Sequence, residues 1–283
     1  MKSEEFLIEA KEYVNRMSNE FSAYKDTLLD IMSVFNKICE QNNIPYYIFF
    51  GTLLGWVRDK GMIPWDADID VAVPIIYIDR LISALKDNLP NDYFVVSNYL
   101  NKDYPLCETR VCKHGCDTDN FHLDVFYLIG APDDLRKANA FKEKIVKTYF
   151  NRLTRNEIID RVKYSSTAVY IIKKAVQTVA RVVPSYIVEN KCQKMLFKYN
   201  FEEAKYFISW CYPTKIYPKE VLESPIKSKL CNVDCMVPSG YETILNILYK
   251  DYKSYLPIED RFNEFYLAYR RFAGIKNNTF RNM

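Results

Sequence analysis

The chain has 283 residues, 49% of them hydrophobic and 27% charged, with a net charge of +3. This composition is typical of a folded globular protein, and the small charge, with basic residues interspersed among acidic ones, excludes a nucleic-acid partner. The sequence contains no run of ~18 apolar residues and no signal-peptide pattern at its N-terminus, so we expect a cytoplasmic protein. The eight cysteines are then expected to be reduced thiols.

Residues 3–42 are predicted to be helical throughout. Apolar residues recur at the spacing of one helix face, and Asn42, Asn43 and Pro45 end the pattern before the first strand. The face consists of Leu28, Leu29, Ile31, Met32, Phe35 and Ile38. We expect it to pack on a central sheet, so that residues 1–44 form an N-terminal helical segment.

The stretch from Tyr46 to Val73 carries several patterns that predict secondary structure, and two of them lie in its first part. An apolar, aromatic run over 46–50 ends at Gly51 and Thr52, and a short apolar segment with helical spacing follows. This order predicts a strand, a glycine turn and a helix. Glycine lets a phosphate approach the backbone, and a helix N-terminus offers free N–H groups and a positive dipole end. The turn therefore suits a phosphate-binding site.

A second strand is predicted after a loop, with acidic and apolar residues alternating. Asp68 and Asp70 share one face, because residues two apart in a strand point to the same side. Two like charges this close favour a bound cation, and carboxylate oxygens suit Mg²⁺ or Mn²⁺. Solvated loop carboxylates are the alternative, but the joint pattern with the Gly-Thr turn favours a metal site.

These residues closely resemble the signature of the LicD family, whose pattern runs roughly GTLLGxVRHxxxIPWDDDID. The matching segments are 51–55, 57–58, 61, 63–66 and 68–70. The resemblance implies a branch of the nucleotidyltransferase fold, in which a small-residue turn precedes an acidic pair and a later strand carries a third carboxylate. Family members are phosphotransferases that move phosphocholine, or another phospho-substituent, from a CDP-activated donor to a glycan. The related fukutin group transfers ribitol phosphate.

Two positions depart from the family pattern. Asp59 stands where His is usual, and Ala67 interrupts the acidic triplet, which implies that position 67 is not a metal ligand here. Neither change removes a residue of the alternating pair. Arg58 is expected to pair with a donor phosphate or with Asp66. The donor-binding residues expected in this stretch are Gly51, Thr52, Arg58 and Asp66.

A helix is predicted over 76–89, and strands are predicted over 93–100 and 108–113, the last ending in a turn at 114–115. The family usually carries a basic strand at this point. Arg110 and Lys113 are therefore expected to neutralise donor phosphates, and solvated hairpin residues are the alternative.

Three cysteines bracket His114 in this region. The spacing of Cys107, Cys112 and Cys116 is too loose for a standard zinc knuckle, which favours buried or edge thiols. A zinc site is the alternative, and Cys231 and Cys235 could complete it if the fold brings them near.

The stretch 121–129 is apolar except for His122 and Asp124, which predicts a buried strand. An Asp inside such a strand needs a partner, and the resemblance implies a third carboxylate there. Asp124 is therefore the expected third metal ligand beside Asp68 and Asp70, and an ion pair with an arginine is the alternative. His122 shares its face and either reaches the site or is a structural histidine.

Residues 131–283 are expected to form a helical region that completes the active site. Asp133 and Asp134 precede a basic helix predicted over 135–150. Within 165–183, apolar residues line one side of a helix and basic residues another, and Pro184 ends it. Such a helix either packs on the catalytic core or rests on an anionic bilayer, which would give peripheral membrane contact through 165–183.

Residues 237–257 resemble the closing motif of the family, VPxGYxxxLxxxYGDY, with Lys250 in place of the usual glycine. Gly240 and Tyr241 open a helix in this motif. The resemblance implies either a helix N-terminus over the active site, with Tyr241 as a donor-binding residue, or docking of the last helix on the sheet.

Together these features predict an α+β protein with a nucleotidyltransferase-like mixed β-sheet core over 45–130, flanked by helices. The resemblance implies a magnesium-dependent phosphotransferase in which Asp68, Asp70 and Asp124 are catalytic. It would transfer phosphocholine from CDP-choline to a glycan of lipopolysaccharide, teichoic acid or capsule, lipid-linked or free, at the inner face of the membrane, and release CMP. The alternatives are a nucleotidyltransferase that acts on a nucleoside triphosphate and a non-catalytic glycan- or membrane-binding relative.

Overall fold

The computed structural model describes residues 24–64, 66, 68–101, 104, 106–114, 122–156, 159, 166–211, 214–257 and 260–261. The predicted helical segment over 3–23 lies outside these residues, as do Trp65, Ala67 and Cys116.

The first described element is a helix over residues 24–41. It ends just before Asn42 and Asn43, as the sequence predicts, and Ile44 N–H closes the end by donating to the carbonyl of Cys39 at 2.9 Å. Its predicted apolar face is confirmed as core, since the side chains of Leu28, Ile31, Met32 and Phe35 are fully buried.

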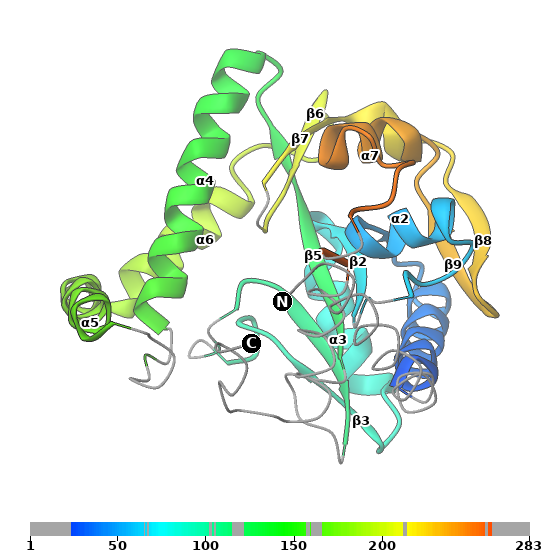
Figure 1. Ribbon diagram of the computed structural model, residues 1–283, viewed down its shortest axis with the longest axis horizontal. Helices are drawn as coiled ribbons and strands as arrows, with labels where there is room; N and C mark the ends of the chain where they lie inside the picture. Colours follow the sequence, from blue (N-terminus) through cyan, green and yellow to red (C-terminus); the bar gives the residue numbers. More distant parts are fainter. Residues whose placement is uncertain are drawn as a thin grey trace, which may run out of the picture.

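A mixed sheet forms the centre of the molecule (Figure 1), confirming the predicted α+β class. The strand order is β1-β2-β5-β4-β3, and β6 pairs with β5 and β7. Only β2 and β5 pair in parallel among these strands; the other pairs are antiparallel. The strands are β1 (Tyr47–Ile48), β2 (Ile69–Pro74), β3 (Tyr93–Val96), β4 (Thr109–Lys113), β5 (His122–Ala131), β6 (Tyr206–Ser209) and β7 (Ile216–Pro218).

Strand β5 organises the sheet because it is twice as long as most of its neighbours. Its first half pairs with β4, its second half pairs with β6, and β2 runs along its other side. The register places Asp124 opposite Asp70 on β2 and opposite Arg110 on β4. Three charged side chains therefore meet across three adjacent strands.

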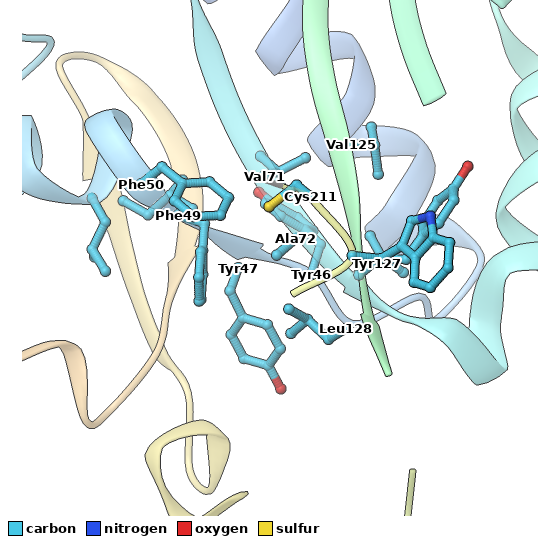
Figure 2. Close-up of a cluster of buried hydrophobic side chains, with 14 of the residues drawn as sticks. Tyr46, Tyr47, Phe49, Phe50, Val71, Ala72, Val125, Tyr127, Leu128 and Cys211 are labelled. Atoms are coloured by element: carbon cyan, nitrogen blue, oxygen red, sulfur yellow. The ribbon is translucent and has the colours of Figure 1, made fainter. Parts of the chain in front are cut away.

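The core fills the space between β1, the start of α2 (Phe50–Arg58) and strands β2 and β5. Figure 2 shows Phe49 and Phe50 beside each other in this cluster, with Tyr47 of β1 and Leu128 of β5 lower in the same view. The Phe49 and Phe50 rings meet edge to face, with centroids 5.0 Å apart. Aromatic packing of this kind fixes the direction in which the chain enters α2.

Two elements differ in detail from their predicted ranges. The helix expected over 76–89 begins as a 3-10 turn, η1 (Ile75–Tyr77), and continues as α3 (Ile78–Asn88). The strand expected over 93–100 ends at Val96, because residues 98–100 turn and Leu100 N–H donates to the carbonyl of Ser97 at 3.1 Å.

The C-terminal region contains the predicted helices. It also contains strands, which the sequence did not predict for residues 131–283. Strand β6 extends the central sheet, so residue 130 is not a boundary of that sheet. The strands are short, with three to five residues each, and such runs carry little periodicity. The further elements are α4 (Leu135–Asn156), α5 (Thr167–Val182), α6 (Ser185–Leu196), η3 (Lys219–Leu222), the hairpin β8 (Ile226–Leu230) and β9 (Val233–Val237), and α7 (Tyr241–Tyr249).

In Figure 1, α4, α5 and α6 lie on one side of β5, and α2, α7 and the β8–β9 hairpin lie on the other. Pro184 separates α5 from α6, as predicted. No helix within the described ranges is both long enough and apolar enough to cross a bilayer.

Candidate active site

Three carboxylates converge at one end of the parallel pair β2 and β5. Asp68, Asp70 and Asp124 each offer an oxygen, and these oxygens lie within 4.8 Å of one another. Asp70 and Asp124 are direct partners in the sheet register, and Asp68 precedes Asp70 by two residues, so all three point to the same side. On the opposite face, Ile69, Val71 and Val73 are fully buried.

The charges of this cluster oppose one another. Burial raises the pKa of Asp70 well above its ordinary value, and the nearby carboxylates of Asp68 and Asp124 raise it further. Burial acts in the same direction on Asp124, but His122 and the Arg110 guanidinium outweigh it and hold the pKa of Asp124 below its usual value. Asp124 is therefore ionised, and its charge adds to the repulsion at Asp70.

The donor set fits a divalent cation. Among the residues that the structure describes, these three carboxylates are the group of His, Cys, Asp and Glu side chains placed to hold a metal ion together. An all-oxygen set of this kind suits Mg²⁺ or Mn²⁺ better than zinc. Arg110 Nε donates to Asp124 Oδ1 at 2.8 Å, and His122 Nε2 lies 3.4 Å from Oδ2, so the carboxylate is held in a fixed orientation.

The N-terminus of α2 lies beside this cluster. Phe50 adopts a φ of 44°, the left-handed conformation, which turns the chain sharply from β1 into the helix. No side chain caps the helix, and the first-turn N–H groups have no carbonyl four residues earlier within the helix. At Gly51 a Cβ atom would lie 2.6 Å from Asp66 Oδ2, so glycine is needed for the carboxylate to approach.

Two further residues predicted for donor binding in this stretch, Thr52 and Arg58, make contacts with other parts of the protein. Thr52 is buried, and its hydroxyl accepts a hydrogen bond from the Asp70 N–H at 2.8 Å, so its side chain joins α2 to β2. Arg58 pairs with Asp59 at 3.0 Å, and its guanidinium lies 4.4 Å from the centre of the Tyr255 ring. Asp59, the departure from the family pattern, therefore orients Arg58.

A cavity of about 450 Å³ opens beside the carboxylates. The C-terminal region supplies one wall, through the last residue of α7 and residues that follow it, and α2 with the acidic loop supplies the other. Its lining residues are Phe50, Gly51, Leu54, Arg58, Ile63, Asp66, Asp68, Asp70, Phe126, Tyr249, Asp251, Tyr252, Ser254 and Leu256. A cavity of this volume is of the size that binds small-molecule ligands.

Two residues predicted for donor binding lie elsewhere. Lys113 points to the face of β4 opposite Arg110 and forms an ion pair with Asp30 of the N-terminal helix. Tyr241 does not line the cavity; its ring packs edge to face on Trp56, with centroids 5.4 Å apart. Tyr241 thus docks α7 on the helix α2, whereas the alternative for this motif was docking on the sheet.

The cysteines of the described segments are thiols and form no disulfide with one another. Cys107 and Cys112 are buried, and burial raises the pKa of Cys107 to about 12, which keeps it protonated. Cys235 is buried on β9, and Cys231 is exposed in the β8–β9 turn.

Sequence reasoning missed several residues of the site. Glu108 is 5% exposed, and burial together with Asp124 raises its pKa to about 7. Lys25 donates to the carbonyls of Ile63 and Pro64, both at 2.9 Å, and so holds the loop before Asp66. The cavity residues Tyr249, Asp251 and Tyr252 fall within the predicted closing motif, which was the available signal; Glu108 and Lys25 had none.

A mixed sheet with two adjacent parallel strands, carboxylates converging from both, and a helix N-terminus beside them define a nucleotidyltransferase-type domain. Residues 43–150 match the family model described as "LicD/FKTN/FKRP, nucleotidyltransferase domain". This part of the chain, residues 43–150, is thus similar to the nucleotidyltransferase domain of the LicD family.

Three curated proteins are also similar to this chain. Lipopolysaccharide cholinephosphotransferase LicD of Haemophilus influenzae is 24% identical over 255 residues, which cover 82% of this chain and 91% of that protein. An uncharacterized protein of Rickettsia typhi is 28% identical over 120 residues, covering 28% of this chain and 38% of the relative. One of Rickettsia prowazekii is 43% identical over 47 residues, covering 17% and 18%.

Proposed function

We propose that the protein transfers phosphocholine, or a similar phospho-substituent, from a CDP-activated donor to a hydroxyl group of a cell-surface glycan and releases CMP. The observation that carries this proposal is the convergence of Asp68, Asp70 and Asp124 beside a ligand-sized cavity. The similarity to the Haemophilus relative, a lipopolysaccharide cholinephosphotransferase, supports the transferred group and the glycan acceptor.

Asp68, Asp70 and Asp124 would hold Mg²⁺ or Mn²⁺, because their repulsion at Asp70 is relieved by a cation between them. When bound, such an ion supplies positive charge to the donor pyrophosphate and lowers the pKa of the acceptor hydroxyl. Arg110 and His122 keep Asp124 ionised and oriented for this role.

The remaining chemistry falls to residues of the cavity. The N–H groups at the start of α2 receive a donor phosphate, and Arg58 adds positive charge at the same wall. Asp66 lines the cavity and accepts the proton of the acceptor hydroxyl, since Asp124 already accepts from Arg110 and its pKa is held below the ordinary value. The acceptor oxygen forms a bond to the distal phosphorus while the bond from that phosphorus to CMP breaks.

The aromatic lining favours choline among the possible substituents. Phe50, Phe126, Tyr249 and Tyr252 line the cavity together with Asp251. A quaternary ammonium group is attracted to aromatic ring faces and to a carboxylate, whereas ribitol offers only hydroxyl groups. These residues therefore support phosphocholine as the transferred group.

The proposal is tested by incubating the protein with CDP-choline, Mg²⁺ and a lipopolysaccharide or teichoic-acid acceptor, and by measuring CMP and glycan-bound choline. We expect both products from the wild type and from Asp87→Asn, which changes an exposed carboxylate on α3. Neither product should form with Asp68→Asn or Asp70→Asn. Equal activity in these two variants and the wild type would remove the assignment.

The same carboxylates would serve a nucleotidyltransferase, which attacks the α-phosphorus of a nucleoside triphosphate. Parallel reactions with CTP and ATP separate the two functions. Pyrophosphate release from a triphosphate, with CDP-choline left intact, would replace the proposed reaction. Mg²⁺-dependent binding of CDP-choline without turnover of any donor would indicate a binding protein instead.

A further inference from the structure

Helix α5 packs on the protein with its polar side and turns its apolar side outward. Gln177 is 2% exposed, and its side-chain amide donates to the carbonyl of Thr154 on α4 at 3.1 Å. Arg181 donates to the carbonyl of Arg155 at 3.1 Å, and Arg155 donates to the carbonyl of Ala180 at 2.9 Å. An ordinary surface helix buries its apolar stripe, so this arrangement is reversed.

The outward side of α5 is continuous and apolar. Ile172 is 62% exposed, Val179 is 70% exposed and Val182 is 78% exposed. In Figure 1, α5 lies at the outer end of the α4–α6 group, away from the central sheet. We call this surface the α5 face; its exposed side chains are Val169, Ile171, Ile172, Val176, Val179, Val182, Val183, Tyr186 and Ile187. Contiguous apolar surface of this kind marks a site of interaction.

The helices that carry the α5 face are strongly basic. Residues 135–198 contain fifteen Lys and Arg against four Asp and Glu, a net charge of +11 in a chain whose total is +3. The rest of the chain therefore carries −8. The even mixing of charges inferred from the chain as a whole does not hold for this segment, which is a cationic region attached to an acidic body.

A groove between α4 and α6 concentrates this charge next to the α5 face. Its volume is about 790 Å³, and none of the described residues that line it is acidic. Ile187, at the start of α6, is exposed, lines the groove and follows the end of α5 by five residues, so the groove begins at the α6 end of the α5 face. The basic side chains of the groove are Lys144, Lys147, Lys191, Lys194 and Lys198.

We propose that the α5 face docks on the surface of an anionic phospholipid bilayer, with the lysine groove binding lipid phosphate groups. The apolar side chains enter the boundary between headgroups and acyl chains, and the lysines neutralise the headgroups. A second copy of the chain is a poorer occupant of this face, because a symmetric contact would bring the two cationic regions together. The inference does not depend on the transfer reaction.

The test is flotation of the full-length protein with vesicles of equal parts phosphatidylglycerol and phosphatidylcholine, compared with phosphatidylcholine alone. We expect flotation with the anionic vesicles only. The double variant Ile172→Glu/Val179→Glu should reduce binding by about tenfold or more, because it places charge where apolar side chains enter the bilayer. Ile226→Glu, a matched change at an exposed residue of β8, should leave binding unchanged.

The double variant Lys191→Glu/Lys194→Glu tests the contribution of the lysine groove to vesicle binding separately from that of the α5 face. This variant should lose the preference for anionic vesicles, and its remaining binding should respond less to added salt than that of the wild type. Thermal unfolding followed by circular dichroism serves as the folding control. If Ile172→Glu/Val179→Glu melts earlier than the wild type, Val182→Glu alone provides the same test at the 78% exposed position.

Three results would overturn the proposal. The wild type could fail to float with anionic vesicles, or the α5-face variants could bind them as tightly as the wild type does. A dimer of the wild type that Val182→Glu converts to a monomer, measured by light scattering, would assign the face to a second copy instead.

Discussion

Asp70 is the residue at which the demands of folding and of the site conflict. Its carboxylate is half-buried and lies close to those of Asp68 and Asp124, and loss of solvent together with these charges raises its pKa well above the ordinary value. A group whose pKa is higher in the folded state binds protons more tightly there, and its ionisation destabilises the fold as pH rises above the unfolded-state value. At neutral pH in metal-free buffer, Asp70 therefore lowers stability.

The first prediction concerns Asp70→Asn. In metal-free buffer at neutral pH, the variant should melt at the same temperature as the wild type or at a higher one, because the repulsion is removed. Added Mg²⁺ should raise the melting temperature of the wild type but not that of the variant. Transfer should fall by roughly a thousandfold or more. Differential scanning calorimetry with and without Mg²⁺ checks the stability, and Asp87→Asn should behave like the wild type.

The second prediction concerns pH and Glu108. Burial and the charge of Asp124 raise the pKa of Glu108 from 4.5 to about 7. Its stabilising contribution is complete below pH 4.5 and is lost as pH rises through 7, because ionisation then occurs in the buried state. Glu108→Gln should therefore match the wild type near pH 5 and exceed it above pH 7, by up to about 3 kcal/mol. Urea unfolding at the two pH values measures the difference in stability between the variant and the wild type. A difference that is the same at both pH values would contradict the explanation by Glu108 ionisation.

At the scale of elements, α2 determines where the backbone proposed to bind phosphate lies. Two of its glycines stand against different neighbours. At Gly55 a Cβ atom would lie 2.5 Å from the carbonyl oxygen of Gly61 and 2.8 Å from the backbone nitrogen of Ile63. At Gly51 the obstructing atom is the end of the Asp66 side chain. The first contact fixes the helix on the loop, and the second shapes the site.

The third prediction follows from this difference. Gly55→Ala should lower stability by about 1–3 kcal/mol, because backbone atoms cannot move aside without displacing the loop. Gly51→Ala, the matched change in the same helix, should leave stability nearly unchanged, since the Asp66 side chain can rotate. It should instead weaken donor binding by displacing Asp66. Chemical denaturation and titration calorimetry with CDP-choline measure the two effects, and equal loss of stability would contradict the argument.

The elements of the site were predictable from the sequence because their signals are local. Alternation at Asp68 and Asp70, the glycine turn and the polar interruption at Asp124 each identify a strand or a turn within a few residues. What the sequence could not supply is register. Arg110 and Lys113 are three residues apart on one strand and so face opposite sides, but only the pairing of β4 with β5 shows which of them faces Asp124.

The orientation of α5 was also beyond the sequence. Its pattern of apolar and basic residues is the same whichever side packs on the protein. The outcome depends on Arg155 and Thr154 of α4, whose backbone carbonyls at the end of that helix accept hydrogen bonds from α5 side chains. Because these hydrogen bonds join residues far apart in the sequence, they leave no periodic pattern from which the orientation of α5 could be predicted.

At the scale of the whole molecule, Arg152 connects the helical layer to the catalytic sheet. Its side chain is fully buried and reaches from α4 to the segment that precedes β4. It donates to the carbonyls of Tyr104 and Leu106, each at 2.8 Å, and forms an ion pair with Glu189 of α6 at 2.8 Å. The segment it holds leads directly into Glu108 and Arg110. The Arg152 side chain therefore contacts both the cationic helices and the segment next to the active site.

The fourth prediction tests this anchor. Arg152→Ala should lower the free energy of unfolding by about 3–5 kcal/mol, because it leaves Glu189 and two backbone carbonyls without their buried donor. Arg152→Lys should recover little of that loss, since a single ammonium group cannot reach carbonyls on two sides and a carboxylate at once. Arg136→Ala, at an exposed position of the same helix, should change stability by less than about 0.5 kcal/mol. Urea denaturation measures all three, and near-equal stability of Arg152→Ala and Arg136→Ala would show that the helical layer is held to the sheet by its apolar contacts alone.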